Sequence, residues 1–231
     1  MPILANAAIA GEVDWKTVPV LPFEAACVPQ SWYRFMQMPV VSYAIPALVA
    51  IGQAKYRNDP PRNPLSNLIR KLSVSRTLRV LQRMQPSSGG FLEAIPLTSF
   101  VVMGLSCSGH ADHPVVENGL RFIRDSVRSE GSWPIDTNLA TWNTSLSISA
   151  LSQTLAPDHT STSKTRGAHD RRELLNEMYQ PELLDWLLGC QNLDRHPFTG
   201  AKPGGWGWSD LSGAVPDADD TPGALLALRY W

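Results

Sequence analysis

Cysteine is scarce in this sequence, and the three cysteines present are not placed to form a framework. Cys27, Cys107 and Cys190 are odd in number and far apart, and no Cys-x-x-Cys pair occurs. This spacing argues against a disulfide scaffold or a structural zinc site, and it fits a reducing compartment.

An excess of charge and long apolar runs are lacking as well. The 231 residues have a formal net charge of −1, so nothing in the charge indicates a nucleic-acid partner. The longest apolar stretch, residues 38–52, is shorter than a membrane span and contains Pro46, which predicts a buried helix. Residues 1–11 lack the basic start of a signal peptide.

No alternating strand pattern is present, whereas helical patterns recur. An irregular, proline-rich stretch is predicted at residues 12–30. Helices are predicted over residues 30–55 with breaks at prolines, and over residues 65–85, 97–105, 115–127, 142–155, 172–191 and 223–230, with a polar linker at residues 158–172. A unit of helix, Gly-aromatic turn and helix recurs about every forty to seventy residues, which is typical of stacked helix pairs. We therefore predict an all-α fold, either a solenoid or a closed α/α barrel.

The helix predicted over residues 65–85 is basic and amphipathic. Leu68, Leu72, Leu78 and Leu81 fall near helical spacing, with arginine and lysine between them. Such a helix can lie on a membrane surface or pack on its own domain, and both interpretations stay open.

The stretch from Pro216 to Pro222 is the most unusual in the sequence, because Asp217, Asp219 and Asp220 fall within four positions. A helix is predicted to follow, with Pro222 at its first position and Asp220 or Thr221 as its cap. The helix dipole favours charged carboxylates there, whereas their mutual repulsion favours a shared proton.

By itself this stretch is compatible with a helix cap, a metal site or an acid catalyst. An EF-hand loop is excluded, because its sixth and twelfth residues counted from Asp217 would be Pro222 and Leu228 instead of Gly and Glu.

Several motifs resemble those of the triterpene cyclases. The QW repeat, Gln-x3-Gly-x-Trp, is matched in full or in part by Gln85, Gly89 and Phe91, by Gly131 and Trp133, and by Gln191, Gly205 and Trp206. We interpret these turns as structural, with Gln85 and Gln191 bonding to neighbouring helix ends. The run Asp217-Ala-Asp219-Asp220-Thr221 matches the DxDDT signature of squalene–hopene cyclases, which are class II terpene cyclases.

The resemblance implies an α/α (toroid) barrel of QW helix pairs that is incomplete in this chain. Residues 1–64 would come from the first barrel region of the family, and residues 65–231 would form a partial barrel with the DxDDT motif. Because the related enzymes are more than twice as long, the resemblance implies a central fragment, inactive alone.

The resemblance also implies a reaction, in which a terminal alkene of squalene or a related isoprenoid is protonated and cationic polycyclisation follows. Asp219 would be the proton donor, with Asp217 and Asp220 as its electrostatic partners. Trp208, Trp142 and Asn143 fall where the family lines its pocket, and no metal or cofactor is implied. Four residues depart from the family pattern: Phe91, Val127, Asn143 and Pro222.

An enzyme of triterpenoid or hopanoid biosynthesis would act on a substrate that lives in membranes. The resemblance therefore implies a monotopic protein at the cytoplasmic face of a membrane, and a homodimer is compatible with it.

Two other functions stay open. One is a non-catalytic helical-repeat interaction module derived from the cyclase fold. The other is a barrel like the β subunit of protein prenyltransferases, for which His110 and His113 near Cys107 would have to bind zinc. Ordinary surface histidines are the simpler interpretation of these residues.

Overall fold

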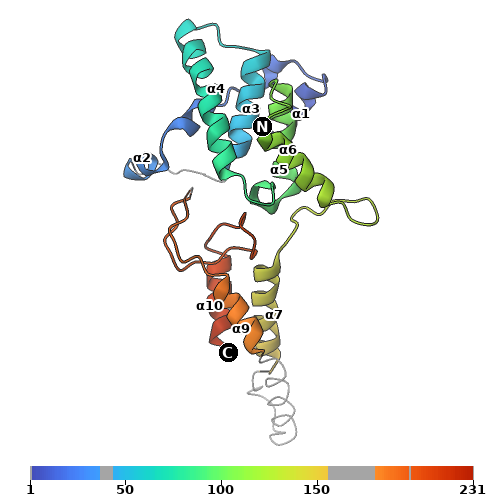
Figure 1. Ribbon diagram of the computed structural model, residues 1–231, viewed down its shortest axis with the longest axis vertical. Coiled ribbons are helices and arrows are strands. Elements are labelled where there is room, and N and C mark those ends of the chain that lie inside the picture. The colour runs from blue at the N-terminus through green and yellow to red at the C-terminus, as the bar shows by residue number, and fades with distance from the viewer. Residues whose placement is uncertain (1, 37–43, 156–179, 198, 231) are drawn as a thin grey trace, which may run out of the picture. The chain divides into compact units, whose positions relative to one another are not determined.

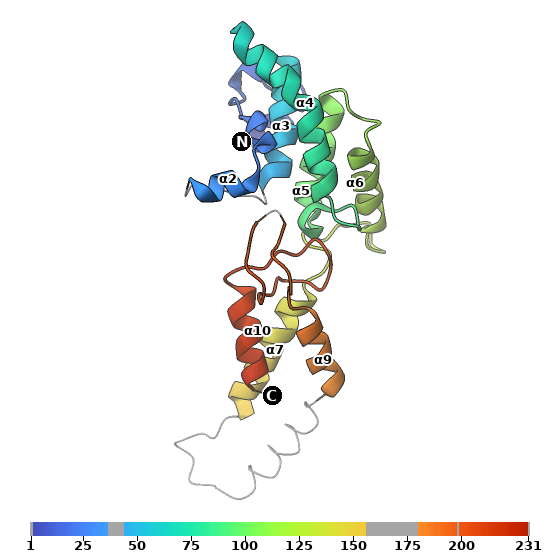
Figure 2. The ribbon, with the colours of Figure 1, turned by 60° about the vertical axis from the view of Figure 1, so that its left-hand side comes forward.

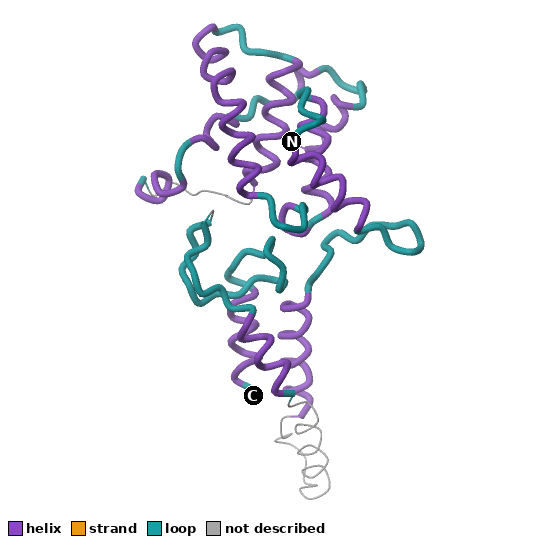
Figure 3. Tube along the Cα trace, viewed as in Figure 1, coloured by secondary structure: helices purple, strands orange, loops and turns teal. Residues whose placement is uncertain are grey.

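The computed structural model describes residues 2–36, 44–155, 180–197 and 199–230. Within these ranges the regular structure is helical and no strand is formed, so the fold is all-α, as predicted (Figure 3). None of the described helices combines the length and the apolar character needed to cross a bilayer.

The chain divides into two compact units according to its internal contacts. Unit 1 consists of Met1–Thr137 with the short segments Pro197–Gly200 and Leu211–Gly213, and unit 2 consists of Asn138–His196, Ala201–Asp210 and Ala214–Trp231. The predicted division between residues 64 and 65 depends on the resemblance to a known family and stays a prediction.

Unit 1 is built from helices joined by short 3₁₀ turns (Figure 1). The helices are α1 (Pro2–Ile9), α2 (Gln30–Phe35), α3 (Ile45–Asn58), α4 (Pro64–Met84), α5 (Ile95–Cys107) and α6 (Pro114–Asp125), and the turns are η1 (Trp15–Thr17), η2 (Phe23–Cys27) and η4 (Phe91–Glu93). Helix α3 packs against α4, α5 and η2, and α5 also contacts α1 and α6. The helices predicted over residues 65–85, 97–105 and 115–127 are therefore present as α4, α5 and α6.

The first N–H groups of these helices have no partner within the helix. They are either absent, because the residue is proline, or hydrogen-bonded to a side chain. Proline occupies one of the first two positions of α3, α4, α5 and α6, where its missing N–H removes no helical hydrogen bond. Asn63 Oδ1 accepts hydrogen bonds from Leu65 N and Ser66 N at the start of α4. His113 Nδ1 accepts one from Val115 N at the start of α6.

The core of unit 1 forms where α3 and α5 approach each other closely. A Cβ atom on Gly104 would lie 2.9 Å from the backbone of Ala50, so only glycine permits this approach. Side chains from α3, α4, α5, α6 and η2 are buried around the contact, including Phe23, Val49, Leu81, Leu105 and Val115. Helix α1 is held on this body by a smaller apolar cluster, formed by Ala5, Ala8, Val18 and Ile51.

Unit 2 contains α7 (Ala140–Leu155), α9 (Pro181–Gly189) and α10 (Asp220–Arg229), as Figure 2 shows. Helices α7 and α10 pack against each other. The indole of Trp206 is buried in this unit and donates Nε1–H to Leu187 O at 2.7 Å. Trp206 shares its cluster with Ile148 of α7 and with Ala224 and Ala227 of α10.

The helix predicted over residues 172–191 is not continuous, because Gln180 is extended, the conformation favoured before proline, and α9 begins at Pro181. Residues 156–179, which include the predicted linker and the predicted start at residue 172, lie outside the described residues. One predicted helix start in unit 2 is wrong. The helix predicted from residue 223 begins at Asp220, so Pro222 stands third in it. Proline fits there because none of the first four N–H groups of a helix has a partner within it.

Candidate active site

The Asp-rich stretch forms a tight turn that leads into α10. Asp217 Oδ1 accepts hydrogen bonds from Asp219 N at 2.9 Å and from Asp220 N at 2.7 Å. Asp217 therefore caps the helix from outside, whereas Asp219, at the cap position, makes no side-chain cap bond. The predicted caps, Asp220 and Thr221, both lie inside the helix, so that prediction is wrong.

The third Gly-Trp turn holds the Asp-rich turn in place. Trp206 N donates to Thr221 Oγ1 at 3.0 Å, and Thr221 Oγ1 donates to Trp206 O at 3.2 Å. Asp217 N also donates to Trp206 O at 3.2 Å. An added Cβ on Gly205 would lie 3.0 Å from Pro216 Cβ, so glycine lets the two segments come this close. The threonine of the signature thus links the carboxylates to the repeat.

The three carboxyl groups differ strongly in exposure. Asp219 is exposed and Asp217 is half-buried, whereas Asp220 is only 3% exposed. The Oδ2 atom of Asp220 is buried and has no hydrogen-bond partner. A buried carboxyl oxygen in that position favours the neutral, protonated form of the group.

The pKa of Asp220 is accordingly raised from 3.8 to about 7. Burial is the largest cause, followed by hydrogen bonding with Asp217 and by the negative charges of Asp217 and Asp219. Near neutral pH the cluster can therefore store a proton on Asp220. Asp219, the proton donor implied by the resemblance, is its exposed neighbour.

The residues expected to line a substrate pocket are only partly brought together. Trp142 N donates to Trp208 O at 3.1 Å, which joins the start of α7 to the segment after Trp206. The Trp208 side chain is half-buried, and its Nε1 is buried without a hydrogen-bond partner. Trp142 and Asn143 are exposed. Exposed indole faces of this kind can stabilise a cation.

The first Gly-aromatic turn contains the hydrogen bonds that were expected of its glutamine. Gln85 Nε2 donates to Gly89 O at 2.9 Å and to Val115 O at 3.0 Å, which joins the end of α4 to the start of α6. Gly89 has a φ of +89°, and a Cβ there would lie 2.5 Å from Asn118 O. Phe91 is buried in the core of unit 1, so phenylalanine fills the place of tryptophan in this repeat.

The second Gly-aromatic turn has no glutamine that could make such hydrogen bonds. Val127 stands where the repeat expects glutamine, and it is exposed. Gly131 has a φ of +83° with open space around it. Trp133 is 50% exposed and donates Nε1–H to Ile123 O at 2.8 Å. Without the glutamine, this turn leaves its aromatic ring half in solvent.

In the third Gly-aromatic turn a glutamine again donates a hydrogen bond to a glycine carbonyl group. Gln191 Nε2 donates to Gly204 O at 3.0 Å, and Asn192 Nδ2 donates to Gly205 O at 3.3 Å. The aromatic residue of this turn, Trp206, is buried, unlike Trp133. The first and third turns therefore share a Gln-to-Gly hydrogen bond and a buried ring.

Glu93, which none of the motifs singles out, is a buried carboxyl group in the first turn. Its side chain is 0% exposed. Oε1 accepts hydrogen bonds from Ser88 Oγ at 3.0 Å and from Gly213 N at 3.1 Å, and Oε2 has no partner. Burial raises the pKa of Glu93 against the opposite effect of these two hydrogen bonds.

The backbone around Glu93 is strained. Leu92 and Glu93 have φ angles of 56° and 54°, a region that residues other than glycine rarely adopt. Glu93 O accepts hydrogen bonds from Thr137 N at 3.0 Å and Thr137 Oγ1 at 3.1 Å, which hold the turn in this form. The signal in the sequence is a lone acidic residue in an apolar, Gly-rich turn, and strain of this kind is common at functional sites.

The residues considered for zinc have structural contacts of their own. His113 caps α6, and Cys107 Sγ accepts a hydrogen bond from Asn58 Nδ2 at 3.4 Å. Burial lowers the pKa of both His110 and His113. In the part of the chain that the structure describes, no group of three or more His, Cys, Asp or Glu side chains is arranged to hold a metal ion.

No protein-family model matches this chain, and no curated protein matches it. The resemblance to triterpene cyclases therefore depends on the sequence motifs alone.

Proposed function

We propose that this sequence belongs to a class II terpene cyclase similar to the squalene–hopene cyclases, and that its helices form part of an α/α barrel. The observation that carries this proposal is the Asp-rich turn. Asp217, Asp219 and Asp220 are held together on a Gly-Trp turn, and one of the three is buried with a pKa of about 7.

Protonation of an unactivated alkene requires a carboxyl group that is neutral at the pH of the cell and shielded from water. In the proposed reaction the proton stored on Asp220 passes to the carboxylate of Asp219, and Asp219 then transfers it to a terminal alkene of squalene or a related isoprenoid and becomes a carboxylate again. The proton adds to one alkene carbon, and the carbocation that forms on its neighbour is attacked by the next alkene. Asp217 orients the turn through its two backbone hydrogen bonds.

Aromatic faces stabilise the positive charge as it migrates along the folding chain. Trp208 and Trp142 are the proposed aromatic residues, and Asn143 is their proposed polar neighbour. No metal or cofactor takes part in this reaction.

The cyclisation needs an enclosed pocket, so we propose it for a polypeptide in which this sequence is joined to the rest of a barrel, and the 231 residues alone are expected to be inactive. The test is made with the longest reading frame that contains the sequence. It is incubated with squalene in detergent, and cyclised products are sought by mass spectrometry.

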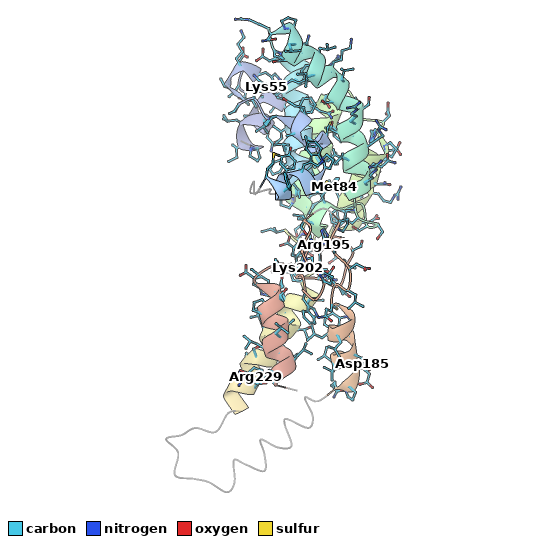
Figure 4. All side chains as sticks on the ribbon, turned by 90° about the vertical axis from the view of Figure 1, so that its left-hand side faces the viewer. Lys55, Met84, Asp185, Arg195, Lys202 and Arg229 are labelled. Carbon is cyan, nitrogen blue, oxygen red and sulfur yellow. The ribbon has the colours of Figure 1, made fainter. Side chains whose placement is uncertain are left out.

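Variants of that polypeptide identify the acid. We expect product from wild type and from Asp185→Asn, a control on the exposed side of α9 that is labelled in Figure 4. We expect none from Asp219→Asn, because the amide of asparagine is too weak an acid to protonate an alkene. Product from Asp219→Asn at the wild-type rate would rule out the proposed donor.

A second candidate function is a helical-repeat interaction module without catalysis. It is favoured by the second turn, where Val127 replaces glutamine and Trp133 is half exposed. Folded wild-type protein that converts neither squalene nor a related isoprenoid would support this function over the cyclase.

We further propose that the protein lies peripherally on a membrane through α4. The outward side of this helix exposes four apolar side chains at helical spacing, Leu65, Leu68, Ile69 and Leu72. Replacing Leu68 and Leu72 by aspartate should abolish sedimentation with phosphatidylcholine vesicles, and unchanged sedimentation would exclude this contact.

A further inference from the structure

Unit 1 contains a pocket of about 350 Å³ that the proposed cyclase reaction does not use. It lies where η1, the end of α3 and the start of α4 meet, and it is lined by Lys16, Val20, Asp59, Pro60, Pro61, Arg62 and Arg70. Three cationic side chains thus face one carboxylate. The volume is in the range of small-molecule sites, and the two prolines give the pocket a stiff wall.

The carboxylate of the pocket, Asp59, is already paired with a buried lysine. Lys55 is buried on α3, near the end of unit 1 away from Met84 (Figure 4). Its ammonium group donates to Asp59 Oδ2 at 2.5 Å and to Trp15 O. The Lys55 bond therefore fixes Asp59 and also ties η1, which carries Lys16, to the end of α3.

One of the three cations is also neutralised. Arg70 is buried, and its Nη2 donates to Glu24 Oε1 and to Leu21 O, both at 3.4 Å. Its guanidinium group lies over the ring of Phe23, 5.7 Å from the ring centre. Arg70 is therefore a fixed part of the pocket wall.

Lys16 and Arg62 differ from these residues. Both are exposed, and neither forms an ion pair with any residue in the described ranges. After Lys55, these two side chains lower the pKa of Asp59, so both lie near the same carboxylate. The positive charges of Lys16 and Arg62 are thus uncompensated, whereas the other charged groups that line the pocket, Asp59 and Arg70, are already paired.

We propose that this pocket binds a phosphate group, with Lys16 and Arg62 as its ligands. A guanidinium group matches two phosphate oxygens with parallel N–H donors, and an ammonium group supplies a point charge for a third. A doubly charged phosphate monoester balances the two free cations. The group can come from a soluble phosphate compound or from the headgroup of an acidic phospholipid, and its binding is independent of the cyclase reaction.

The test measures binding of inorganic phosphate to the 231-residue chain at low ionic strength, by NMR chemical shifts of backbone amides. Lys16→Gln and Arg62→Gln remove the proposed ligands. Lys202→Gln and Arg121→Gln are the matched controls, since both side chains are exposed, lie outside α4 and do not line the pocket. Circular dichroism checks that all four variants are folded.

A second arm identifies the source of the phosphate group. The same proteins are sedimented with phosphatidylcholine vesicles that contain or lack phosphatidic acid. We expect either ligand variant to weaken binding of phosphate, or of the phosphatidic acid vesicles, about tenfold, because each removes a charge-assisted hydrogen bond. The control variants should bind as wild type does.

Saturable phosphate binding that Arg62→Gln weakens supports a soluble ligand. Binding that requires phosphatidic acid and Arg62 supports a lipid headgroup. The proposal is overturned if neither probe binds, or if Arg121→Gln weakens binding as much as Arg62→Gln does, because binding would then follow total charge instead of the pocket.

Discussion

At the scale of single residues, Asp220 links the stability of unit 2 to pH. Its carboxyl group has a pKa of 3.8 when unperturbed and of about 7 in the folded protein, chiefly because it is buried. Between these two values the folded protein holds a proton that the unfolded chain has released. The free energy of unfolding therefore falls as the pH rises, by at most about 1.4 kcal/mol per pH unit for one proton.

Asp220→Asn removes this titration, because asparagine stays neutral. We expect the variant and wild type to be similarly stable near pH 4 and the variant to be the more stable above about pH 7. Urea unfolding followed by circular dichroism at several pH values measures the difference. Asp185→Asn is the control, since that side chain is exposed on α9 and is not among the groups that shift the pKa of Asp220, and it should follow wild type. A difference that does not change with pH would contradict the perturbed pKa of Asp220.

Glu93 allows a test that separates its hydrogen bonds from its charge. Glu93→Gln keeps an oxygen for Ser88 and Gly213, whereas Glu93→Ala leaves both donors without an acceptor, which costs about 1–3 kcal/mol. Because burial raises the pKa of Glu93, the stability due to its neutral form is present at low pH and is lost as the pH rises through that pKa.

We therefore expect Glu93→Gln to unfold at a higher temperature than wild type in mildly alkaline buffer, and Glu93→Ala to unfold at a lower temperature throughout. Thermal unfolding at two pH values measures both. If glutamine were the worse replacement at both values, the hydrogen bonds to Oε1 would not be what stabilises the turn.

At the scale of elements, the repeat turns provide a matched pair of glycines with different surroundings. Both Gly89 and Gly131 have positive φ angles, which cost an alanine about 1–2 kcal/mol. At Gly131 nothing lies within 4 Å of an added Cβ, whereas at Gly89 it would lie 2.5 Å from Asn118 O. The difference isolates the steric contact between the first turn and α6.

We expect Gly131→Ala to cost only the conformational term, and Gly89→Ala to cost about 1–3 kcal/mol more because the turn must move away from α6. Urea unfolding of both variants measures this. Equal losses would indicate that the first turn is free to shift and that the close approach to α6 stabilises nothing.

The elements could be predicted where local signals were strong. α4, α5 and α6 each have a proline at the start and enough length to be recognised, and their bounds lie within two residues of the predicted ones. Helix α1 was not predicted, because its buried residues, Ala5 and Ala8, are small and the whole stretch is apolar without a distinct face. The start of α10 was missed because Asp217 caps it from outside the helix.

The residues that make up the candidate site could be predicted from the sequence, but their arrangement and burial could not. The signature names Asp217, Asp219, Asp220 and Thr221, but which carboxyl group is buried depends on packing that the local sequence does not encode. Asp220 is buried and Asp219 is exposed because the turn is fixed by Trp206, a residue 11 to 15 positions upstream of its partners Asp217 and Thr221. Glu93 was missed for the same reason, since Gly213, which bonds to it, lies 120 residues away.

At the scale of the whole molecule, the division into two units predicts the outcome of truncation. The apolar clusters of unit 1 draw on residues between Ala5 and Ile123, all of which a fragment of residues 1–137 retains. We expect that fragment to be helical and to unfold cooperatively. A coil-like circular dichroism spectrum would show that unit 1 is not an independent folding unit.

The fragment also lacks Leu211–Gly213, the distant segment that belongs to unit 1. In the full chain this segment donates Gly213 N to Glu93 Oε1 at 3.1 Å, and Ser212 Oγ lies 3.0 Å from Ser87 Oγ. Glu93→Ala should therefore cost less in the fragment than in the full chain, by about 1 kcal/mol, because one of the two donors is already absent. Urea unfolding of the four proteins measures this coupling. An equal cost in both backgrounds would mean that the bond to Gly213 contributes nothing to unit 1, and that the buried carboxyl group is held by Ser88 and the strained turn alone.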